Sequence, residues 1–241
     1  MIQESPLLSF FDKIYIINLA ERSDRRRDMV KQLEKLNPEN SRKNVSFFSA
    51  IKPQNKGDFP SIGCRGCFLS HLAVLKNALL EKHSRILIVE DDLSFNQYLI
   101  HNQGAIINEL SQLSWDFCYL GHSVQLPKNE GSRFVKYEDP IMLAHFVGIK
   151  KRVMKDLVAF LEAILTRPAG HPDGGPMHVD GAYSTFRKQH ANLITLVANP
   201  SLGFQRSSPS DIAGHKWFDT IPLVNQLAAL ARKLKNLSRR R

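Results

Sequence analysis

The sequence of 241 residues contains no run of 18 uncharged apolar residues and only three cysteines. A helix needs about 20 predominantly apolar residues to cross a bilayer, so no membrane-spanning helix is predicted. The opening MIQESPLLSFFDK lacks the basic segment and long apolar core of a secretory signal, and we therefore expect a cytoplasmic protein. Three cysteines in such a chain do not predict a disulfide framework.

The common nucleotide-binding fingerprints are also missing. No GxxxxGK[ST] segment occurs, and no GxGxxG follows the first predicted strand. These absences argue against a P-loop enzyme and against ordinary dinucleotide binding. No nucleic-acid-binding module is recognisable either, so no nucleic-acid partner is expected.

The net charge of +10 lies mostly at the C-terminal end, where seven basic residues and one acidic residue follow position 214. A helix is predicted over 222–237, with a leucine stripe from Leu223 to Leu237. One interpretation is a helix docked on the domain. The other is a helix lying on an anionic inner membrane surface, where each basic residue contributes about 1 kcal/mol. We divide the chain into a domain over 12–212 and a basic amphipathic tail over 213–241.

Strand-like and helix-like segments alternate along the chain. Strands are predicted over 13–18, 45–50, 85–89, 115–120, 141–149 and 193–198, and helices over 22–36, 67–80, 106–113 and 153–165. This order predicts an α/β domain with a largely parallel sheet. Ligands of such sheets bind beyond the carboxyl ends of the strands.

Three consecutive carboxylates, Glu90, Asp91 and Asp92, end the strongest predicted strand, RILIV. They repel one another, and a hard divalent cation such as Mg²⁺ or Mn²⁺ removes that repulsion while bridging a diphosphate. A solvated acidic turn is the alternative. At the end of the first strand, Asn18, Arg22 and Arg25 are placed to meet a nucleotide, unless they form a solvated helix face with local ion pairs.

Cys64 and Cys67 form a CxxC, with His71 four residues further on. No second CxxC or HxxxH supplies the remaining ligands of a structural zinc site, so packing of a helix start is favoured over zinc or thiol chemistry. In a later loop, Asp180 is a candidate general base or a helix cap, and Asp116 and Asp173 compete for the role of base.

Five blocks in order resemble glycosyltransferase family 25, the lipooligosaccharide galactosyltransferases and their collagen-modifying relatives. They are IYIINLAERSDRR (14–26), IGCRGCFLSHLAVLKNALL (62–80), ILIVEDDL (86–93), WDFCYLG (115–121) and NPSLGFQRSSPSDI (199–212). The resemblance covers about residues 12–212. It departs from the family at Leu75, where an aromatic residue is common, and in having Ser94 rather than a carboxylate two residues after Asp92.

The resemblance implies a Rossmann-like glycosyltransferase A fold and inverting transfer of a hexose, usually galactose from UDP-galactose, onto a glycan or glycolipid. It places Glu90, Asp91 and Asp92 near a Mn²⁺ or Mg²⁺ ion and the diphosphate. It also places Asn18, Arg22 and Arg25 on the nucleotide side, and Ser70 and His71 at matched positions of unassigned role. The acceptor-side base is expected to be Asp180. The alternatives are a nucleotide-sugar-binding domain without turnover and a CxxC thiol or zinc protein.

Overall fold

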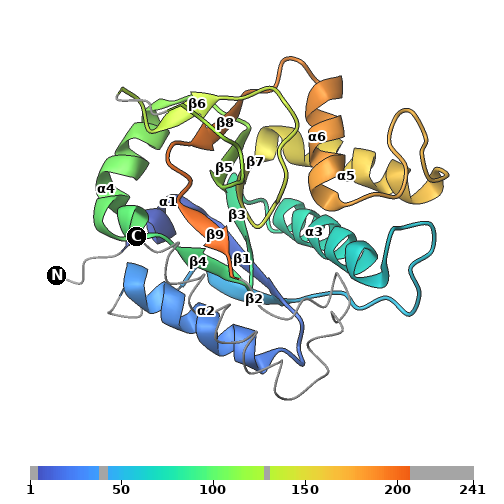
Figure 1. Ribbon diagram of the computed structural model, residues 1–241, viewed down its shortest axis with the longest axis horizontal. Coiled ribbons are helices and arrows are strands. Elements are labelled where there is room, and N and C mark those ends of the chain that lie inside the picture. Colours follow the sequence, from blue (N-terminus) through green and yellow to red (C-terminus); the bar gives the residue numbers. More distant parts are fainter. Residues whose placement is uncertain (1–4, 38–42, 128–130, 207–241) are drawn as a thin grey trace.

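The computed structural model describes residues 5–37, 43–127 and 131–206 (Figure 1). A seven-stranded sheet with the order β2-β1-β3-β7-β5-β8-β6 forms its centre. These strands are β1 (Lys13–Asn18), β2 (Val45–Ser49), β3 (Arg85–Glu90), β5 (Phe117–Gly121), β6 (Phe134–Lys136), β7 (Phe146–Lys150) and β8 (Thr195–Ala198). A second, two-stranded antiparallel sheet joins β4 (Leu93–Phe95) to β9 (Gly203–Gln205).

Five strands of the large sheet run in one direction, which confirms the predicted α/β, Rossmann-like class. Strand β1 pairs in parallel with both β2 and β3, and β5 pairs in parallel with β8. Strand β7 runs the other way between β3 and β5, and β6 does so beside β8. The described residues between β5 and β7 contain no helix. Because a parallel neighbour needs a long crossover, this connection favours antiparallel pairing.

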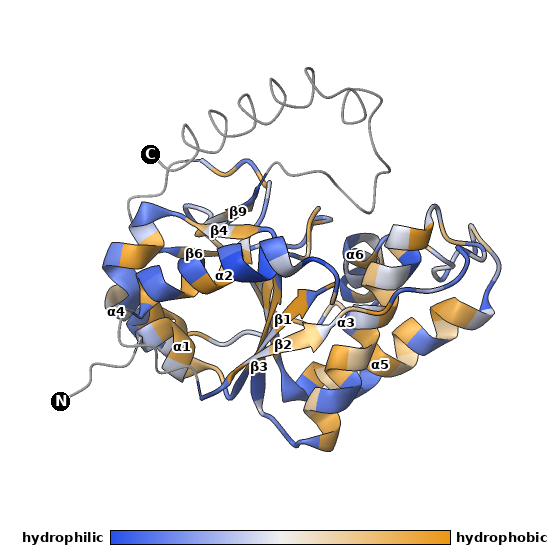
Figure 2. Ribbon diagram, turned by 90° about the horizontal axis from the view of Figure 1, so that it is seen from below, coloured by the Kyte–Doolittle hydropathy of each residue, from blue (hydrophilic) through white to orange (hydrophobic). Residues whose placement is uncertain are grey.

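Helices cover both faces of the sheet. On one face lie α3 (Ile62–Leu80), α5 (Lys151–Thr166) and α6 (Val179–Gln189), and on the other lie α1 (Pro6–Phe10), α2 (Ser23–Leu36) and α4 (Gln97–Gln112). The strands are mainly apolar, whereas the helices carry polar residues on their outer sides (Figure 2). Two apolar cores result, one on each face of the sheet.

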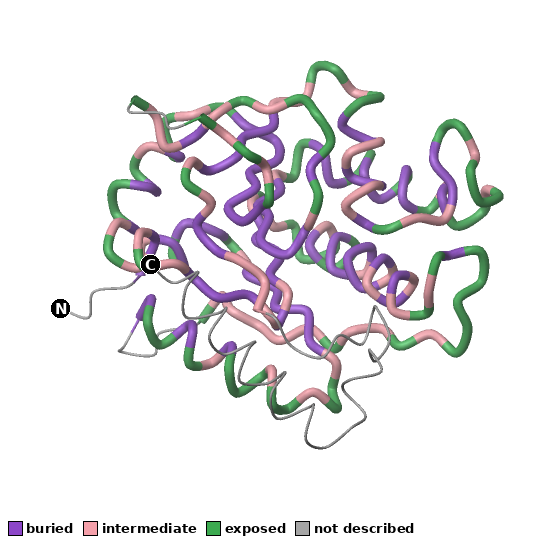
Figure 3. The backbone as a smooth tube through the Cα atoms, viewed as in Figure 1, coloured by how far each residue is buried: buried purple, intermediate pink, exposed green. Residues whose placement is uncertain are grey.

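Strand β3 lies in the middle of this buried region (Figure 3). Its residues Ile86–Val89 are no more than 2% exposed. Since helices cover both faces, the four consecutive positions 86–89 are all apolar, rather than every second one. The strand therefore delivers the carboxylates at its end into the interior of the molecule.

Among the described residues, no helix has both the length and the apolar character needed to cross a membrane. The predicted helix over 222–237 and the whole tail over 213–241 lie outside the described residues, so the domain division stays a prediction.

Candidate functional site

A pocket lies beyond the carboxyl ends of β1, β2 and β3. Its walls come from residues that follow these three strands and from the first turns of α3. Its lining combines the apolar side chains of Leu19, Ile51, Pro53 and Ile62 with the charged side chains of Arg25 and the acidic segment 90–92. We call this the β2-side pocket. It occupies the edge of the sheet at which parallel α/β folds bind ligands.

A second pocket adjoins it on the other side of the acidic segment. His178 and Asp180 line it from the start of α6, Leu143 from the segment before β7, and Gln205 from β9. We call this the α6-side pocket. Both pockets share three lining residues, namely Cys67, Glu90 and Asp92. The two pockets therefore adjoin at these three residues, which we call the shared wall.

The Asp91 carboxylate is held by other side chains. It is 6% exposed, and its oxygens accept hydrogen bonds from Asn18 Nδ2 at 2.7 Å and from Arg25 Nη1 at 2.9 Å. Arg206 Nη2 donates to the Asp91 carbonyl oxygen at 2.7 Å. Through its two carboxylate oxygens, Asp91 therefore connects the end of β3 to β1 and α2. Its role is to position the acidic segment.

The Asp92 carboxylate has fewer hydrogen-bond partners than that of Asp91. Its Oδ2 lies 3.6 Å from Arg25 Nη1, whereas its Oδ1 is buried with no hydrogen-bond partner among the described residues. Burial, together with the nearby charge of Glu90, raises the pKa of Asp92 to about 7. Such an oxygen at a shared pocket wall fits a bound cation, because a hard cation takes carboxylate ligands.

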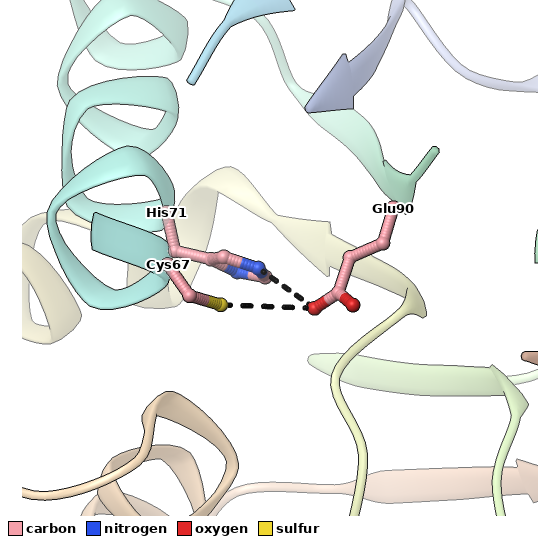
Figure 4. Close-up of side chains that lie close together, drawn as sticks. All are labelled: Cys67, His71 and Glu90. Atoms are coloured by element: carbon pink, nitrogen blue, oxygen red, sulfur yellow. Dashed lines mark hydrogen bonds and ion pairs between the residues drawn. The ribbon is translucent and has the colours of Figure 1, made fainter. Parts of the chain in front are cut away.

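Glu90 turns toward α3 rather than toward Asp91. Its Oε1 lies 3.6 Å from His71 Nε2 and 3.8 Å from Cys67 Sγ (Figure 4), and its Oε2 accepts a hydrogen bond from Gln205 Nε2 at 2.9 Å. Burial by itself raises the pKa of Glu90, but the His71 imidazole, the charge of His145 and the Gln205 hydrogen bond together more than offset this, so the pKa lies below its usual value. The three carboxylates thus face three different sets of neighbours.

Of the residues predicted on the nucleotide side, only Arg25 lines the β2-side pocket with its cationic group near the carboxylates. Asn18 is 4% exposed, and its side-chain amide donates hydrogen bonds to Asp91 and to the Arg22 carbonyl oxygen. Arg22 pairs with Asp24 at 2.9 Å and does not line either pocket. Asn18 and Arg22 therefore shape the turn after β1.

Ser70 and His71 are both fully buried on α3. Ser70 Oγ donates to the Gly66 carbonyl oxygen at 2.7 Å and accepts from the Ile51 N–H at 2.8 Å. Ser70 thereby fixes the segment after β2, which forms a wall of the β2-side pocket. Gly66 sits against the same segment, because a Cβ there would lie 2.7 Å from the Ile51 carbonyl oxygen.

Asp180 lines the α6-side pocket, and both of its oxygens accept backbone hydrogen bonds. Leu143 N–H donates to Oδ2 at 2.9 Å, and Gly181 N–H donates to Oδ1 at 2.8 Å. Leu143 has a φ of 74°, which a leucine rarely adopts, so Asp180 stabilises a strained turn. Of its competitors, Asp116 is 2% exposed and paired with Arg152, and neither Asp116 nor Asp173 lines either of these two pockets.

The two cysteines of the CxxC differ in surroundings. Cys64 is 1% exposed in the core of the α3 face, and burial raises its pKa to about 11. Cys67 faces the shared wall, and burial followed by the charge of Glu90 raises its pKa well above the usual value. Reactive cysteines have lowered pKa values, so this pair does not have the character of a thiol redox site.

Two functional residues escaped the sequence reasoning. Gln205 ends β9 and Arg206 follows it, and both contact the acidic segment. Gln205 donates to the Glu90 side chain, and Arg206 donates to the Asp91 and Asp92 carbonyl oxygens. They lie 113 or more positions along the chain from their partners. The only sequence signal for these two residues was that both lie in the 199–212 block that resembles the family.

The fold and site define an α/β protein with a divided ligand pocket at the carboxyl ends of parallel strands. Residues 11–142 match the model of "Glycosyltransferase family 25 (LPS biosynthesis protein)". This chain belongs to glycosyltransferase family 25.

Curated relatives include the human "Inactive glycosyltransferase 25 family member 3", 28% identical and covering 50% of this chain and 23% of the relative. Procollagen galactosyltransferase 1-B of Xenopus laevis is 28% identical and covers 46% and 21%, and procollagen galactosyltransferase 2 of Mus musculus is 27% identical with the same coverage. The chain spans less than a quarter of the length of these relatives.

Two solved structures are similar in outline. A glycosyltransferase involved in glycosylation of the major capsid of PBCV-1 is 11% identical, with a TM-score of 0.39 over 78% of this chain and 92% of that one. The mannose-1-phosphate geranyltransferase from Thermus thermophilus is 11% identical, with a TM-score of 0.41 over 77% and 72%.

Proposed function

We propose that this protein transfers a hexose, with galactose the expected sugar, from a UDP-sugar to a glycan acceptor in cell-surface glycan synthesis. The observation that carries the proposal is the wall that Cys67, Glu90 and Asp92 form between two pockets. A transferase must hold donor and acceptor next to each other, and a wall with a carboxylate oxygen on it supplies such a junction. Family membership and the galactosyltransferase relatives support the reaction class.

The donor is assigned to the β2-side pocket. Its apolar side, from Leu19, Ile51 and Ile62, suits the base and ribose, and Arg25 suits the diphosphate as a bidentate cation. Asp92, with its unpartnered Oδ1, would hold Mn²⁺ or Mg²⁺, which supplies Lewis-acid stabilisation of the charge on the leaving diphosphate. Arg25 and Arg206 keep the acidic segment in place around that charge.

The acceptor is assigned to the α6-side pocket, whose lining includes the polar side chains of His178, Asp180 and Gln205. An acceptor hydroxyl there attacks the sugar carbon from the side opposite the diphosphate, and Asp180 takes its proton. Direct displacement of this kind inverts the anomeric centre. Asp180 keeps lone pairs for this role, because a carboxylate offers about four acceptor positions and two are used by Leu143 and Gly181.

A panel of nucleotide sugars with and without Mn²⁺, read by thermal unfolding of the full chain, tests the donor. The preferred donor at 100 times its Kd should add about 2.7 kcal/mol to the free energy of unfolding. A stabilising UDP-sugar that also gives transfer to a glycan acceptor supports the proposal, and no stabilisation by any nucleotide sugar contradicts it. Binding without turnover would favour the second candidate, a non-catalytic binding domain, which the inactive human relative brings into consideration.

We also propose that the acceptor is a glycolipid and that the basic tail over 213–241 attaches the protein to the inner membrane surface. Electrostatic attachment weakens with salt, because the Debye length is about 8 Å at physiological ionic strength. The full chain should sediment with anionic vesicles at low salt and be released at high salt. Sedimentation that is unaffected by salt, or absent at low salt, contradicts this part of the proposal.

A further inference from the structure

Three potential metal ligands of different chemistry converge beside the shared wall. Cys67 and His71 lie one turn apart on α3, and Glu90 meets them from the end of β3 (Figure 4). One ligand atom from each residue lies within 4.8 Å of the other two. This is the one group of its kind that the described part of the chain contains.

The two separations from Glu90 Oε1 are close to those of atoms that share a metal ion. Zinc bonds of about 2.3 Å to sulfur, 2.0–2.1 Å to nitrogen and 2.0–2.2 Å to oxygen place tetrahedral ligand atoms about 3.4–3.6 Å apart. Here Cys67 Sγ lies 3.8 Å and His71 Nε2 lies 3.6 Å from Glu90 Oε1. Small side-chain adjustments would bring all three atoms to bonding distance of one ion.

A second observation, independent of the separations, also indicates a metal ion: the Nε2 atom of His71 lacks a partner among the described residues. It is 0% exposed, and its Nε2 is buried without a hydrogen bond. The 3.6 Å to Glu90 Oε1 is too long for one. A buried imidazole nitrogen without a hydrogen bond is destabilising, and a metal ion at the centre of the group would supply its missing partner.

Outer contacts already hold two of the three ligands. The Tyr183 hydroxyl lies 3.0 Å from His71 Nδ1, and Gln205 Nε2 donates to the second oxygen of Glu90 at 2.9 Å. In the metal-bound state, with Nδ1–H donating to Tyr183, Nε2 would present its lone pair to an ion lying between Glu90 and Cys67. Metal-bound histidines commonly have such a partner on the other ring nitrogen.

We propose that Cys67, His71 and Glu90 bind a zinc-type divalent cation. A thiolate and an imidazole favour Zn²⁺ over Mg²⁺ or Mn²⁺, so this ion differs in kind from the hard cation assigned to Asp92. Binding releases the thiol proton of Cys67 to solvent. Three protein ligands leave a fourth position open, as in catalytic zinc sites. Because Cys67 and Glu90 line both pockets, that position borders them.

The test measures zinc binding without any sugar nucleotide, so its result does not depend on the proposed transfer. Chelator-treated full-length protein is titrated with Zn²⁺ against a competing chelator, and bound zinc is counted after gel filtration. Wild type should bind one zinc at this site, and Cys67→Ser should lose it. Cys64→Ser is the matched control on the same helix turn and should bind as wild type does. Tyr183→Phe, which removes only the outer contact, should weaken binding by about 10–100-fold.

A cobalt titration of wild-type protein keeps the test independent of whether the variants fold. One equivalent of Co²⁺ should produce a thiolate-to-metal absorption band that excess Zn²⁺ removes. The proposal is overturned if wild type gives no such band, if Cys67→Ser retains the zinc, or if Cys64→Ser loses it equally. In those cases His71 and Glu90 form a plain ion pair beside an inert thiol.

Discussion

The two pockets that meet at Glu90 and Asp92 are built from different kinds of structure. The β2-side pocket lies at the carboxyl ends of three neighbouring parallel strands, with apolar walls and one arginine. The α6-side pocket combines the approach to the antiparallel β7, the start of α6 and β9, and it carries polar side chains. Under the proposed function, the apolar walls of the first pocket suit a nucleoside and the polar side chains of the second suit a hydroxyl-bearing acceptor.

The largest expected effect separates the acceptor side from the donor side. Asp180→Asn should lower transfer by about 10²–10⁴ while donor affinity stays unchanged, because the base acts on the acceptor hydroxyl. Steady-state kinetics and donor titration measure the two quantities. Ser184→Ala is the control, since Ser184 holds the same turn through both backbone groups of Ile141 without a carboxylate. Equal losses in the two variants would assign Asp180 a purely structural role.

The next effect separates two adjacent carboxylates. Asp92→Asn should reduce transfer by about 10²–10³, the range for losing one preorganised electrostatic contact, with no loss of stability because a costly buried charge disappears. Asp91→Asn should instead lower the free energy of unfolding by about 1.5–3 kcal/mol, since it weakens hydrogen bonds to Asn18 and Arg25. Chemical denaturation and activity assays read both variants. A stable, inactive Asp91→Asn beside an active Asp92→Asn would reverse the assignment.

A smaller effect tests the wall of the β2-side pocket. Gly66→Ala places a Cβ 2.7 Å from the Ile51 carbonyl oxygen, so it should cost about 1–3 kcal/mol of stability and weaken donor binding. Gly104→Ala on α4 is the matched helical control, because a Cβ there meets nothing within 4 Å. It should stabilise the protein by about 0.5–1 kcal/mol. Unchanged donor affinity in Gly66→Ala would remove the 50–53 segment from the donor site.

The smallest effect is a pH dependence of stability that comes from the buried His122. His122 Nε2 lies 2.7 Å from the Ala198 carbonyl oxygen, and its Nδ1 accepts from Val124 N–H at 3.2 Å, so the folded ring is neutral. Burial lowers the pKa of His122. The unfolded chain, with a histidine pKa of about 6.5, therefore binds more protons below that pH, and the free energy of unfolding falls as the pH falls.

His122→Gln should make this fall shallower in denaturation series between pH 5 and pH 8. His178→Gln, at an exposed position, should leave it unchanged. A slope that is the same in wild type and in His122→Gln would contradict the account.

The strands at the centre of the sheet were predictable because their inner residues, 14–17 and 86–89, are all apolar or aromatic. The runs 13–18 and 85–89 were predicted as strands and are so in the structure. The expected strand over 141–149 is confirmed only from Phe146, because Leu143 adopts its unusual φ to meet Asp180. Helix α3 was predicted to start at residue 67 but starts at Ile62. Ser61 caps this earlier start, because its side chain accepts a hydrogen bond from Cys64 N–H.

The candidate site was predictable as a location but not as a set of contacts. A buried strand ending in carboxylates located the acidic segment. The sequence did not indicate that Asp91 accepts hydrogen bonds from Asn18 and Arg25. It also did not indicate that the Glu90 side chain lies against Cys67 and His71. These contacts join segments that are far apart in the chain. The CxxC spacing pairs Cys64 with Cys67, but Cys64 is not part of the group of potential metal ligands. The i, i+4 spacing of Cys67 and His71 on one helix is the sequence pattern that belongs to that group.

Hydrogen exchange of the full chain with UDP and Mn²⁺ tests the assignment of the two pockets most directly. Donor in the β2-side pocket should slow exchange of the backbone amides at residues 51 and 52 and in the first turn of α3. The amides over 141–144 and at the start of α6 should be unchanged until an acceptor is added. Protection by UDP of the 141–144 segment, with residues 51 and 52 unaffected, would contradict the account.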